Sequence, residues 1–187
     1  EYDYNISGWL TKINGGTSFN DSNDVFGMEL KYHNTDDPTK ACFNGIIGQI
    51  DWRNTFTTIN QKQSYTYSYD KLDRLKKAEY YNHLSQTIFY SVTGDADGIR
   101  YDLNGNIKNL QRTSNQIQVD NLSFDYSSGG NQLQKVTDAG NSELFDNGTS
   151  GSAIDYTYDD YGTLEQDKNK DIASITYNHL NLPDTII

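Results

Sequence analysis

Paired carboxylates are the side chains of this sequence whose types and spacing suggest catalysis. Glycosidases need one carboxyl group as an acid and a second as a nucleophile or base at a set separation. Asp70, Asp102 and Asp159, however, recur at one position of an internal repeat, where an Asp side chain starts a turn by bonding its own backbone. A catalytic residue is not expected in every repeat, so we predict turn residues and no enzymatic activity. The pairs considered are Asp36/Asp37, Asp70/Asp73, Asp95/Asp97 and Asp159/Asp160.

We predict no metal site and no cofactor. The stretch DLNGN (102–106) superficially resembles a calcium loop, but Ile107 stands at the glycine position and Thr113 at the closing glutamate position. The acidic stretches DADG (95–98) and NDSND (20–24) are interpreted first as ordinary turns and loops. No glycine-rich loop has the pattern that cradles phosphates or dinucleotides. The three histidines show no ligand spacing, and they are His33, His83 and His179.

Aromatic side chains suggest a different chemistry, the stacking of sugar rings. A tyrosine combines an apolar ring with a polar hydroxyl and suits a half-wet surface. The same residues also stabilise sheets, because aromatic side chains pair across neighbouring strands. We favour packing within and between hairpins, and keep sugar binding as the alternative. The aromatic residues considered for a ligand-facing role are Trp9, Trp52, Tyr80 and Tyr81, with Tyr65 and Tyr90 as further surplus tyrosines.

The composition favours a folded sheet protein with an acidic surface. Only 34% of the 187 residues are hydrophobic, yet 13% are aromatic, and 15 are tyrosine. Aromatic and β-branched side chains suit a pleated surface. The net charge of −11 repels phosphate backbones and anionic membranes, so we exclude nucleic-acid binding and membrane insertion. Cys42, the only cysteine, excludes an internal disulfide framework and is predicted to be a buried, inert thiol.

An internal repeat runs along the chain. Its template begins with an aromatic or β-branched residue, any residue, and Tyr. The Tyr is followed by either Asp or Asn, then by two variable residues, and then by one of Gly, Asn and Asp. An apolar residue comes shortly afterwards. The segment 124–136 fits with one extra residue in its turn, and the segment 42–50 fits only as a degraded copy. The remaining units lie at 2–13, 67–78, 99–110, 156–167 and 175–186.

The template predicts a β-hairpin for each unit. Tyr-x-Tyr places two side chains on the same face of a strand, and the following Asp or Asn starts a turn. Glycine, or Asp73 and Asn181 in its place, supplies the positive φ that the turn requires. The repeat positions are Tyr4, Gly8, Tyr69, Asp70, Asp73, Tyr101, Asp102, Gly105, Tyr126, Gly129, Tyr158, Asp159, Gly162, Tyr177 and Asn178.

These hairpins predict an all-β chain in which consecutive antiparallel hairpins form one curved sheet. A single hairpin is marginal alone, so several must line up side by side. Polar insertions at 14–24, 34–40 and 138–152 are predicted to be surface loops. The segment 69–84 has some helical character, but the template explains its first residues better. We therefore treat residues 1–187 as a single repeat region.

The template resembles the YD repeat of the Rhs family. The stretches YTYSYDKLDRLKKAEYY, YDLNGNIKNLQR and YNHLNLP are especially similar to Rhs-repeat proteins of the Bacteroidetes type. The resemblance implies a spiralling sheet of hairpins that forms a hollow shell. In bacterial Rhs toxins, which are polymorphic toxins, such a shell encloses a C-terminal toxic domain. In animal teneurins a similar shell belongs to an adhesion receptor.

The sequence also departs from the family pattern. Trp9, Asn106 and Thr163 replace the frequent arginine after the turn glycine, and Asp73 and Asn181 replace the glycine itself. Within residues 1–187 we find no counterpart of the self-cleavage segment that often ends such shells, and we expect neither this segment nor the effector domain in this part of the protein. This chain is therefore expected to be a strip of shell wall from a longer protein.

The resemblance implies a structural function. We expect a wall segment of a secreted or cell-surface bacterial shell that encloses or presents a C-terminal effector. The alternative is an adhesion module that binds glycans or a neighbouring cell surface through exposed aromatic residues. The expected partners are the rest of the same polypeptide's shell and an enclosed effector domain, with glycans in the alternative. The isolated chain is expected to self-associate, because open strand edges invite pairing.

Overall fold

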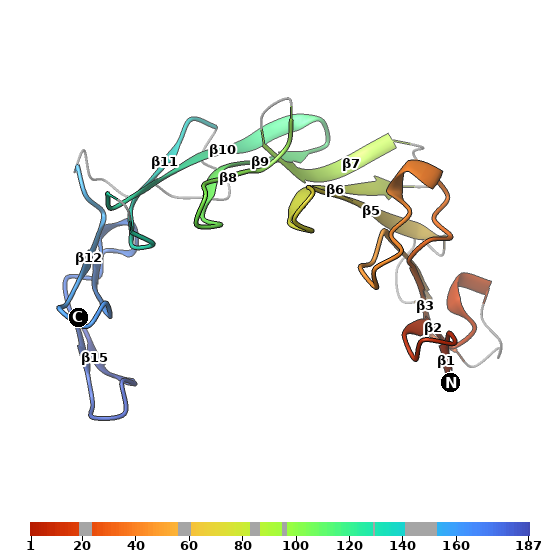
Figure 1. Ribbon diagram of the computed structural model, residues 1–187, viewed down its shortest axis with the longest axis horizontal. Helices are drawn as coiled ribbons and strands as arrows, with labels where there is room; N and C mark the ends of the chain where they lie inside the picture. The colour runs from red at the N-terminus through yellow and green to blue at the C-terminus, as the bar shows by residue number, and fades with distance from the viewer. Residues whose placement is uncertain (19–23, 56–60, 83–86, 95–96, 129, 141–152) are drawn as a thin grey trace. The chain divides into compact units, whose positions relative to one another are not determined.

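Antiparallel strands make up most of the protein. The computed structural model describes residues 1–18, 24–55, 61–82, 87–94, 97–128, 130–140 and 153–187. Within these residues the regular elements are strands and three single-turn 3-10 helices (Figure 1). The prediction of an all-β protein with antiparallel strands in a large sheet is confirmed. None of the helices found there is long and apolar enough to cross a membrane.

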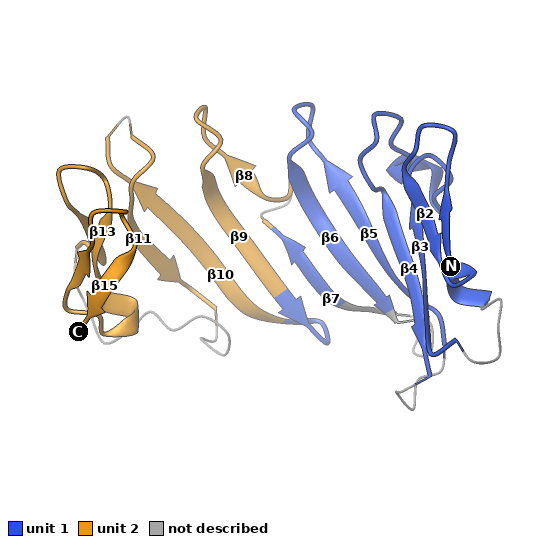
Figure 2. Ribbon diagram, turned by 90° about the horizontal axis from the view of Figure 1, so that it is seen from below, with its two compact units in different colours: residues 1–93, 113–117 blue, residues 94–112, 118–187 orange. Residues whose placement is uncertain are grey.

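The chain divides into two compact units. Unit 1 comprises residues 1–93 and 113–117, and unit 2 comprises residues 94–112 and 118–187 (Figure 2). In unit 1 each strand pairs with the next one along the chain, from β1 to β7. The strands of unit 1 are β1 (Tyr2–Tyr4), β2 (Leu10–Ile13), β3 (Phe26–Lys31), β4 (Gln49–Asn54), β5 (Gln63–Tyr69), β6 (Leu75–Asn82) and β7 (Thr87–Thr93). Its 3-10 helices are Gly16–Ser18 and Pro38–Lys40.

Unit 2 consists of hairpins that follow one another. Its strands are β8 (Arg100–Tyr101), β9 (Ile107–Ser114, whose last two residues belong to unit 1), β10 (Ile117–Tyr126, whose first residue belongs to unit 1), β11 (Leu133–Asp138), β12 (Tyr156–Tyr158), β13 (Leu164–Asp167), β14 (Ile175–Tyr177) and β15 (Pro183–Ile186). A 3-10 helix spans Lys168–Lys170. The buried apolar side chains of this unit are Ile99, Val119, Leu122 and Val136.

One face of the unit 1 sheet is apolar and aromatic. Successive residues of a strand point to opposite faces, and directly paired residues share a face. Trp52 pairs with Met28, which itself pairs with Ile13. A longer row crosses five strands through the pairs of Leu30, Ile50, Tyr65, Tyr80 and Tyr90. We call this the aromatic face.

The opposite face of the same strands is polar. Its first row consists of Lys12, Glu29, Asp51, Ser64 and Tyr81. Its second row consists of Lys31, Gln49, Thr66, Glu79 and Ser91. We call this the polar face. Every strand from β3 to β6 therefore contributes to both faces through alternate residues.

Each well-fitting repeat unit of the sequence coincides with a hairpin, whereas the tight β9–β10 hairpin, with Asn115 and Gln116 in its turn, lies outside the repeat units. Six hairpins, β1–β2, β5–β6, β8–β9, β10–β11, β12–β13 and β14–β15, occupy the six well-fitting segments. In each of them the pairing register shifts at the template tyrosine, as between Thr157 and Tyr158. Residues 42–48 differ, because they contain bends and no strand, and β4 begins only at Gln49. Within unit 1 the turns of the β1–β2 and β5–β6 hairpins lie at the same end of the strands, and within unit 2 those of β8–β9 and β10–β11 do so (Figure 2).

Candidate functional site

The template Asp and Asn side chains bind their own turns. In five hairpins the Oδ1 atom accepts hydrogen bonds from the backbone N–H groups two and four residues later, at 2.8 to 3.2 Å. Hydrogen bonds from the Asn106 and Thr163 side chains and from the turn backbone lower the pKa values of Asp102 and Asp159. An ionised turn carboxylate is a poor general acid. The five turn-binding residues are Asn5, Asp70, Asp102, Asp159 and Asn178.

The turns also have the backbone conformation that the template implies. Gly8, Gly105 and Gly162 have φ values of 78°, 90° and 84°. Asp73 and Asn181 occupy the same place with φ values of 61° and 55°, in the region where Asp and Asn are the best tolerated non-glycine residues. The sixth turn includes Gly129, which lies outside the described residues.

The template tyrosines connect consecutive hairpins. The hydroxyls of four of them, Tyr69, Tyr126, Tyr158 and Tyr177, donate a hydrogen bond to a backbone carbonyl of the segment that precedes their own strand. Tyr32, which no template unit contains, does the same. The pairs are Tyr32 to Leu10 (2.8 Å), Tyr69 to Ile47 (2.7 Å), Tyr126 to Ile107 (3.0 Å), Tyr158 to Leu133 (2.8 Å) and Tyr177 to Leu164 (2.7 Å). Sequence reasoning missed this role, although the constant use of Tyr rather than Phe at this position was a signal for it.

The rings of the aromatic face stack on one another. Trp52 stacks on Tyr65 with centroids 5.8 Å apart and an interplanar angle of 16°, and Tyr65 stacks on Tyr67 at 6.1 Å and 14°. Trp52 also stacks on Tyr80, at 5.8 Å. The Tyr80 hydroxyl donates to Gln63 Oε1 at 2.7 Å. The ring faces that a sugar would need are thus in contact with neighbouring rings, as expected for sheet packing.

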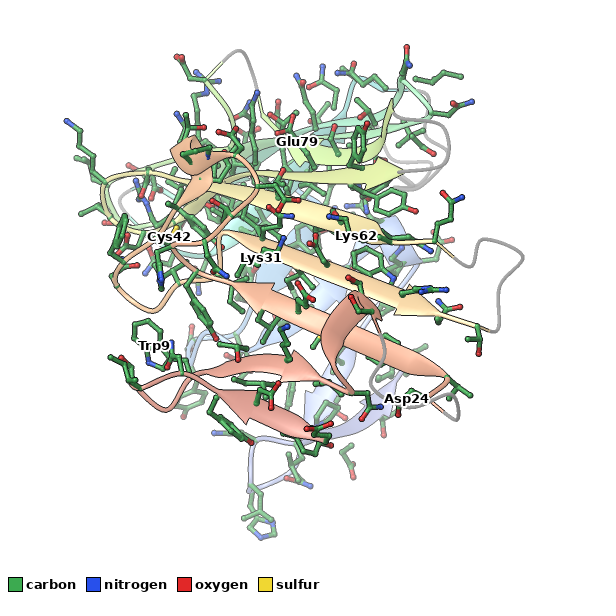
Figure 3. The ribbon with its side chains drawn as sticks, turned by 90° about the vertical axis from the view of Figure 1, so that its right-hand side faces the viewer. Trp9, Asp24, Lys31, Cys42, Lys62 and Glu79 are labelled. Carbon is green, nitrogen blue, oxygen red and sulfur yellow. The ribbon has the colours of Figure 1, made fainter. Side chains whose placement is uncertain are left out.

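The four aromatic residues considered for ligand binding do not form one platform. Trp52 and Tyr80 belong to the aromatic face, whereas Tyr81 belongs to the polar face because it follows Tyr80 directly in β6. Trp9 packs against Tyr32 with ring centroids 5.1 Å apart, near the β1–β2 turn (Figure 3). Of the four, Tyr81 lines a pocket whose other residues are polar.

A buried ion-pair cluster lies on the polar face. Asp51 is fully buried, and its carboxylate lies 2.7 Å from Lys31 Nζ and 3.4 Å from Lys62 Nζ. Gln49 Nε2 and Ser64 Oγ donate to the same carboxylate at 2.7 and 2.5 Å. Asp36, from the loop after β3, bonds Lys31 at 2.6 Å and thereby joins the cluster. Figure 3 shows Lys31, which lies in β3, and Lys62, which directly precedes β5.

The ion pairs shift the pKa values of the cluster in opposite directions. Burial alone would raise the pKa of Asp51, but hydrogen bonds from Gln49, Lys31 and Ser64 and the Lys31 charge hold it below its usual value. Burial alone would lower the pKa of Lys31, but hydrogen bonds to Asp36 and Asp51 raise it. Both groups therefore stay charged across the neutral range, and neither is suited to proton transfer there.

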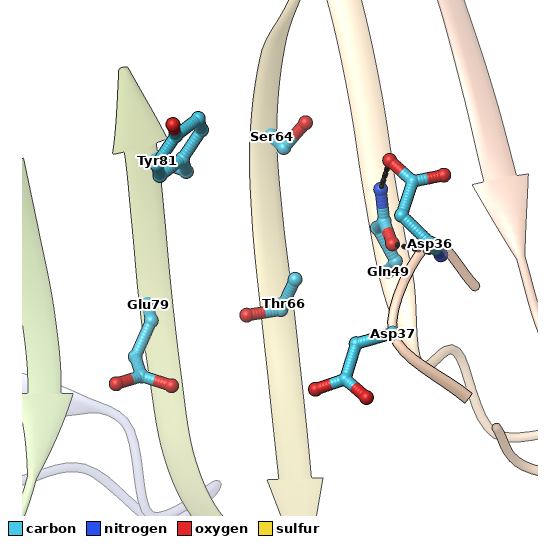
Figure 4. Close-up of a pocket in the computed structure, with 7 residues that line it drawn as sticks. All are labelled: Asp36, Asp37, Gln49, Ser64, Thr66, Glu79 and Tyr81. Carbon is cyan, nitrogen blue, oxygen red and sulfur yellow. Dashed lines mark hydrogen bonds between the residues drawn. The ribbon is translucent and has the colours of Figure 1, made fainter. Parts of the chain in front are cut away.

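A pocket of about 290 Å³ adjoins this cluster. Figure 4 shows the carboxylates of Asp37 and Glu79 on either side of Thr66. Glu79 lies 3.8 Å from Lys40 Nζ, and Asp37 accepts hydrogen bonds from the backbone and hydroxyl of Thr39. The lining consists of Asp36, Asp37, Gln49, Ser64, Thr66, Glu79 and Tyr81. Hydroxyl, amide and carboxylate groups beside an aromatic ring can bind a small, hydroxyl-rich molecule.

The remaining candidates of the sequence do not converge on this pocket. His33 stacks on Phe43, with centroids 5.9 Å apart. Cys42 is half-buried rather than buried, and burial together with the charge of Asp73 raises the pKa of its thiol. Asp95 and His83 lie outside the described residues. Across the described ranges, no three His, Cys, Asp or Glu side chains are grouped so as to hold a metal ion.

No protein-family model matches this chain, and no curated protein matches it. The resemblance to YD repeats therefore rests on the template residues themselves.

Proposed function

We propose that this chain is a structural strip of an Rhs-type shell, secreted or on a bacterial surface, that encloses or presents an effector domain. The observation that supports this most is the series of tyrosine hydroxyls bonded to preceding backbone carbonyls, from Tyr32 to Tyr177. A bond of this kind joins one hairpin to its predecessor, and it can be repeated as often as the template recurs. A spiralling sheet of such hairpins is the form we propose for the wall.

The distribution of buried side chains also suits a wall. Only six apolar side chains are buried among the described residues: Tyr32, Ala78, Ile99, Val119, Leu122 and Val136. Repeat proteins depend on contacts between neighbouring units rather than on one central core. The two faces of the unit 1 sheet differ, since one carries stacked aromatic rings and the other a charged cluster. Two different faces suit a shell wall, because its two sides meet different surroundings.

The test uses the longer protein that we expect to carry this chain. A shell protects the domain inside it, so a protease should leave the effector intact in the wild-type protein. Replacing Tyr126, Tyr158 and Tyr177 together by phenylalanine removes three bonds between hairpins, and the effector should then be cleaved faster. The control is Tyr161→Phe, because Tyr161 is 92% exposed and occupies no template tyrosine position. Equal cleavage of all three proteins, or an effector that is already unprotected in the wild type, would reject the proposal.

Adhesion is the second candidate function, and the pocket on the polar face favours it. Tyr81 places a ring beside the carboxylates and hydroxyls that line this pocket. A glycan array with the isolated chain would test it, comparing Tyr81→Ala with Tyr80→Ala on the opposite face. We expect Tyr81→Ala to abolish binding and Tyr80→Ala to preserve it. Absence of binding by the wild-type chain, or equal loss in both variants, would reject adhesion through this pocket.

A further inference from the structure

Three side chains of the aromatic face are in mutual contact. Tyr65 and Tyr80 are directly paired across β5 and β6, and their ring centroids lie 5.5 Å apart. Trp52, from the neighbouring strand β4, stacks on each of them with centroids 5.8 Å apart. Each of the three rings therefore contacts the other two. We call this group the aromatic triad.

Two tyrosine rings in contact can be joined by oxidation. Loss of one electron and one proton converts a phenol into a tyrosyl radical, whose unpaired electron is shared with the ring carbons beside the hydroxyl. Two such radicals combine through these carbons and give dityrosine. The rings must already lie within reach of each other when the radicals form, so the fold decides which pair reacts.

The strand pairing favours Tyr65 with Tyr80 over the tyrosine contacts within β5. Tyr65 also stacks on Tyr67 at 6.1 Å, and Tyr67 contacts Tyr69 at 6.5 Å. Two positions along a strand span about 6.6 Å, whereas directly paired residues on neighbouring strands have Cβ atoms about 5 Å apart. The cross-strand pair therefore needs the smaller movement to form a carbon–carbon bond.

Both phenols of this pair are accessible to a small oxidant. Tyr65 and Tyr80 are half-buried, so each ring keeps part of its surface in contact with solvent. Burial raises the pKa of both hydroxyls, and the neighbouring Tyr90 raises that of Tyr65 further. Each is therefore a neutral phenol near pH 7 and must release a proton together with its electron.

Trp52 enlarges the target for the oxidant. An indole, like a phenol, is oxidised by loss of one electron and one proton, and Trp52 contacts both tyrosines of the triad. A Trp52 radical can take an electron and a proton from Tyr65 or Tyr80. The indole is then restored, and the radical remains on a tyrosine.

We propose that Tyr65 and Tyr80 are an oxidative cross-linking site, at which a one-electron oxidant joins β5 to β6 through dityrosine. Two equivalents of oxidant each take up one electron, and the two phenols release two protons to solvent. One bond then forms between ring carbons beside the two hydroxyls. The hydrogen atoms on the joined carbons move to the oxygens, which restores both phenols.

The cross-link would stabilise the sheet. It closes a short loop around the β5–β6 turn, and such a closure restricts the unfolded chain more than the folded one. The site is separate from the hydroxyl-to-carbonyl bonds of Tyr126, Tyr158 and Tyr177, so it is judged independently of the proposed wall function.

The test exposes the chain to light-activated tris(bipyridine)ruthenium with persulfate, a one-electron oxidant, and digests the monomer with trypsin. Cleavage after Lys71 and Lys77 places Tyr65 and Tyr80 on different peptides. Mass spectrometry should find these two peptides joined, with two hydrogen atoms fewer than their sum. Tyr65→Phe and Tyr80→Phe should each abolish the joined product, because phenylalanine retains the ring but forms no phenoxyl radical.

Two control variants test the choice of partner. Tyr81→Phe changes the adjacent residue of β6, which lies on the polar face, and Tyr90→Phe changes the residue that pairs with Tyr80 across β7. Both variants should retain the joined peptides. Oxidation should raise the melting temperature of the wild-type chain and not that of Tyr80→Phe. A product that persists in Tyr65→Phe or disappears in Tyr90→Phe, or a wild-type chain that forms dityrosine only between molecules, would overturn the proposal.

Discussion

The two faces of the unit 1 sheet are made by the same strands and are held in different ways. On the aromatic face Trp52, Tyr65 and Tyr67 stack ring against ring, and no ionised group takes part in these contacts. On the polar face Asp51 is buried with Lys31 and depends on that partner for its charge. Ring packing tolerates small changes of side-chain shape. Removing one partner of a buried ion pair, in contrast, leaves an uncompensated buried charge and strongly destabilises the fold. Substitutions on the polar face should therefore lower the free energy of unfolding more than substitutions on the aromatic face.

The largest effect is expected on the polar face. Lys31→Met leaves the buried Asp51 carboxylate without its closest cation, and we expect a loss of about 3 kcal/mol in the free energy of unfolding. Urea denaturation measures it. The matched control is Lys12→Met on the same face, because Lys12 is 44% exposed and lies 3.8 Å from Glu29. That surface pair is expected to contribute under about 1 kcal/mol.

A double variant separates charge from packing in this cluster. Lys31→Met with Asp51→Leu removes both ions, and it should recover most of the stability that Lys31→Met loses. If the double variant is as unstable as the single one, the charge argument for the polar face is wrong.

An intermediate effect is expected on the aromatic face. Trp52→Ala removes the ring that stacks on Tyr65 and Tyr80. Because Trp52 is only half-buried, we expect a loss of about 2 kcal/mol in the free energy of unfolding. Trp52→Phe should lose less than half of that. A loss for Trp52→Ala larger than that for Lys31→Met would reverse the order of the two faces.

A smaller effect is expected at the turns, where both faces end. Asp70→Ala removes the hydrogen bonds that Asp70 Oδ1 accepts from the N–H groups of Leu72 and Arg74, and we expect a loss of about 1 kcal/mol in the free energy of unfolding. Asp70→Asn should be milder, since Asn5 and Asn178 make the same pair of bonds in their own turns. Thermal unfolding followed by circular dichroism compares the variants. Equal losses in both would show that the charge, and not the turn bonds, matters.

The smallest effect near neutral pH is the pH dependence of the free energy of unfolding. It is also the most selective effect, because Asp51 and Lys31, the groups that titrate, both lie on the polar face. The folded-state pKa of Asp51 is lowered, so its contribution is present above its unfolded pKa and is lost as pH falls through the folded pKa. The folded-state pKa of Lys31 is raised, so its contribution is present below its unfolded pKa and is lost as pH rises through the folded pKa.

Melting temperatures across pH should therefore separate the two faces. The double variant Lys31→Met with Asp51→Leu should flatten the curve at both its acid and its alkaline end. Trp52→Ala should shift the whole curve down without changing its form. A double variant with the wild-type pH profile would place the titrating groups outside the cluster.

The hairpins could be predicted from the sequence because they depend on local residue patterns. The spacing of tyrosine, Asp or Asn, and glycine predicted antiparallel hairpins at six segments, and strands occupy all six. The same spacing failed in the degraded copy at 42–50, where Phe43 stands at the tyrosine position although Asn44 occupies the turn position, and residues 43–45 bend instead of forming a strand. Tyr80 and Tyr81 were both considered for a ligand-facing role, although alternation along β6 places them on opposite faces.

The sequence by itself determined the hairpins, because a turn and its two flanking strands involve residues within about a dozen positions and obey local conformational rules. The tertiary structure alone decided which hydroxyl meets which carbonyl, since Tyr69 reaches back 22 residues to Ile47. It also brought Asp36 to Lys62, 26 residues away, beside the buried Asp51. Such contacts depend on the register of several strands at once, and no short stretch of sequence contains that register.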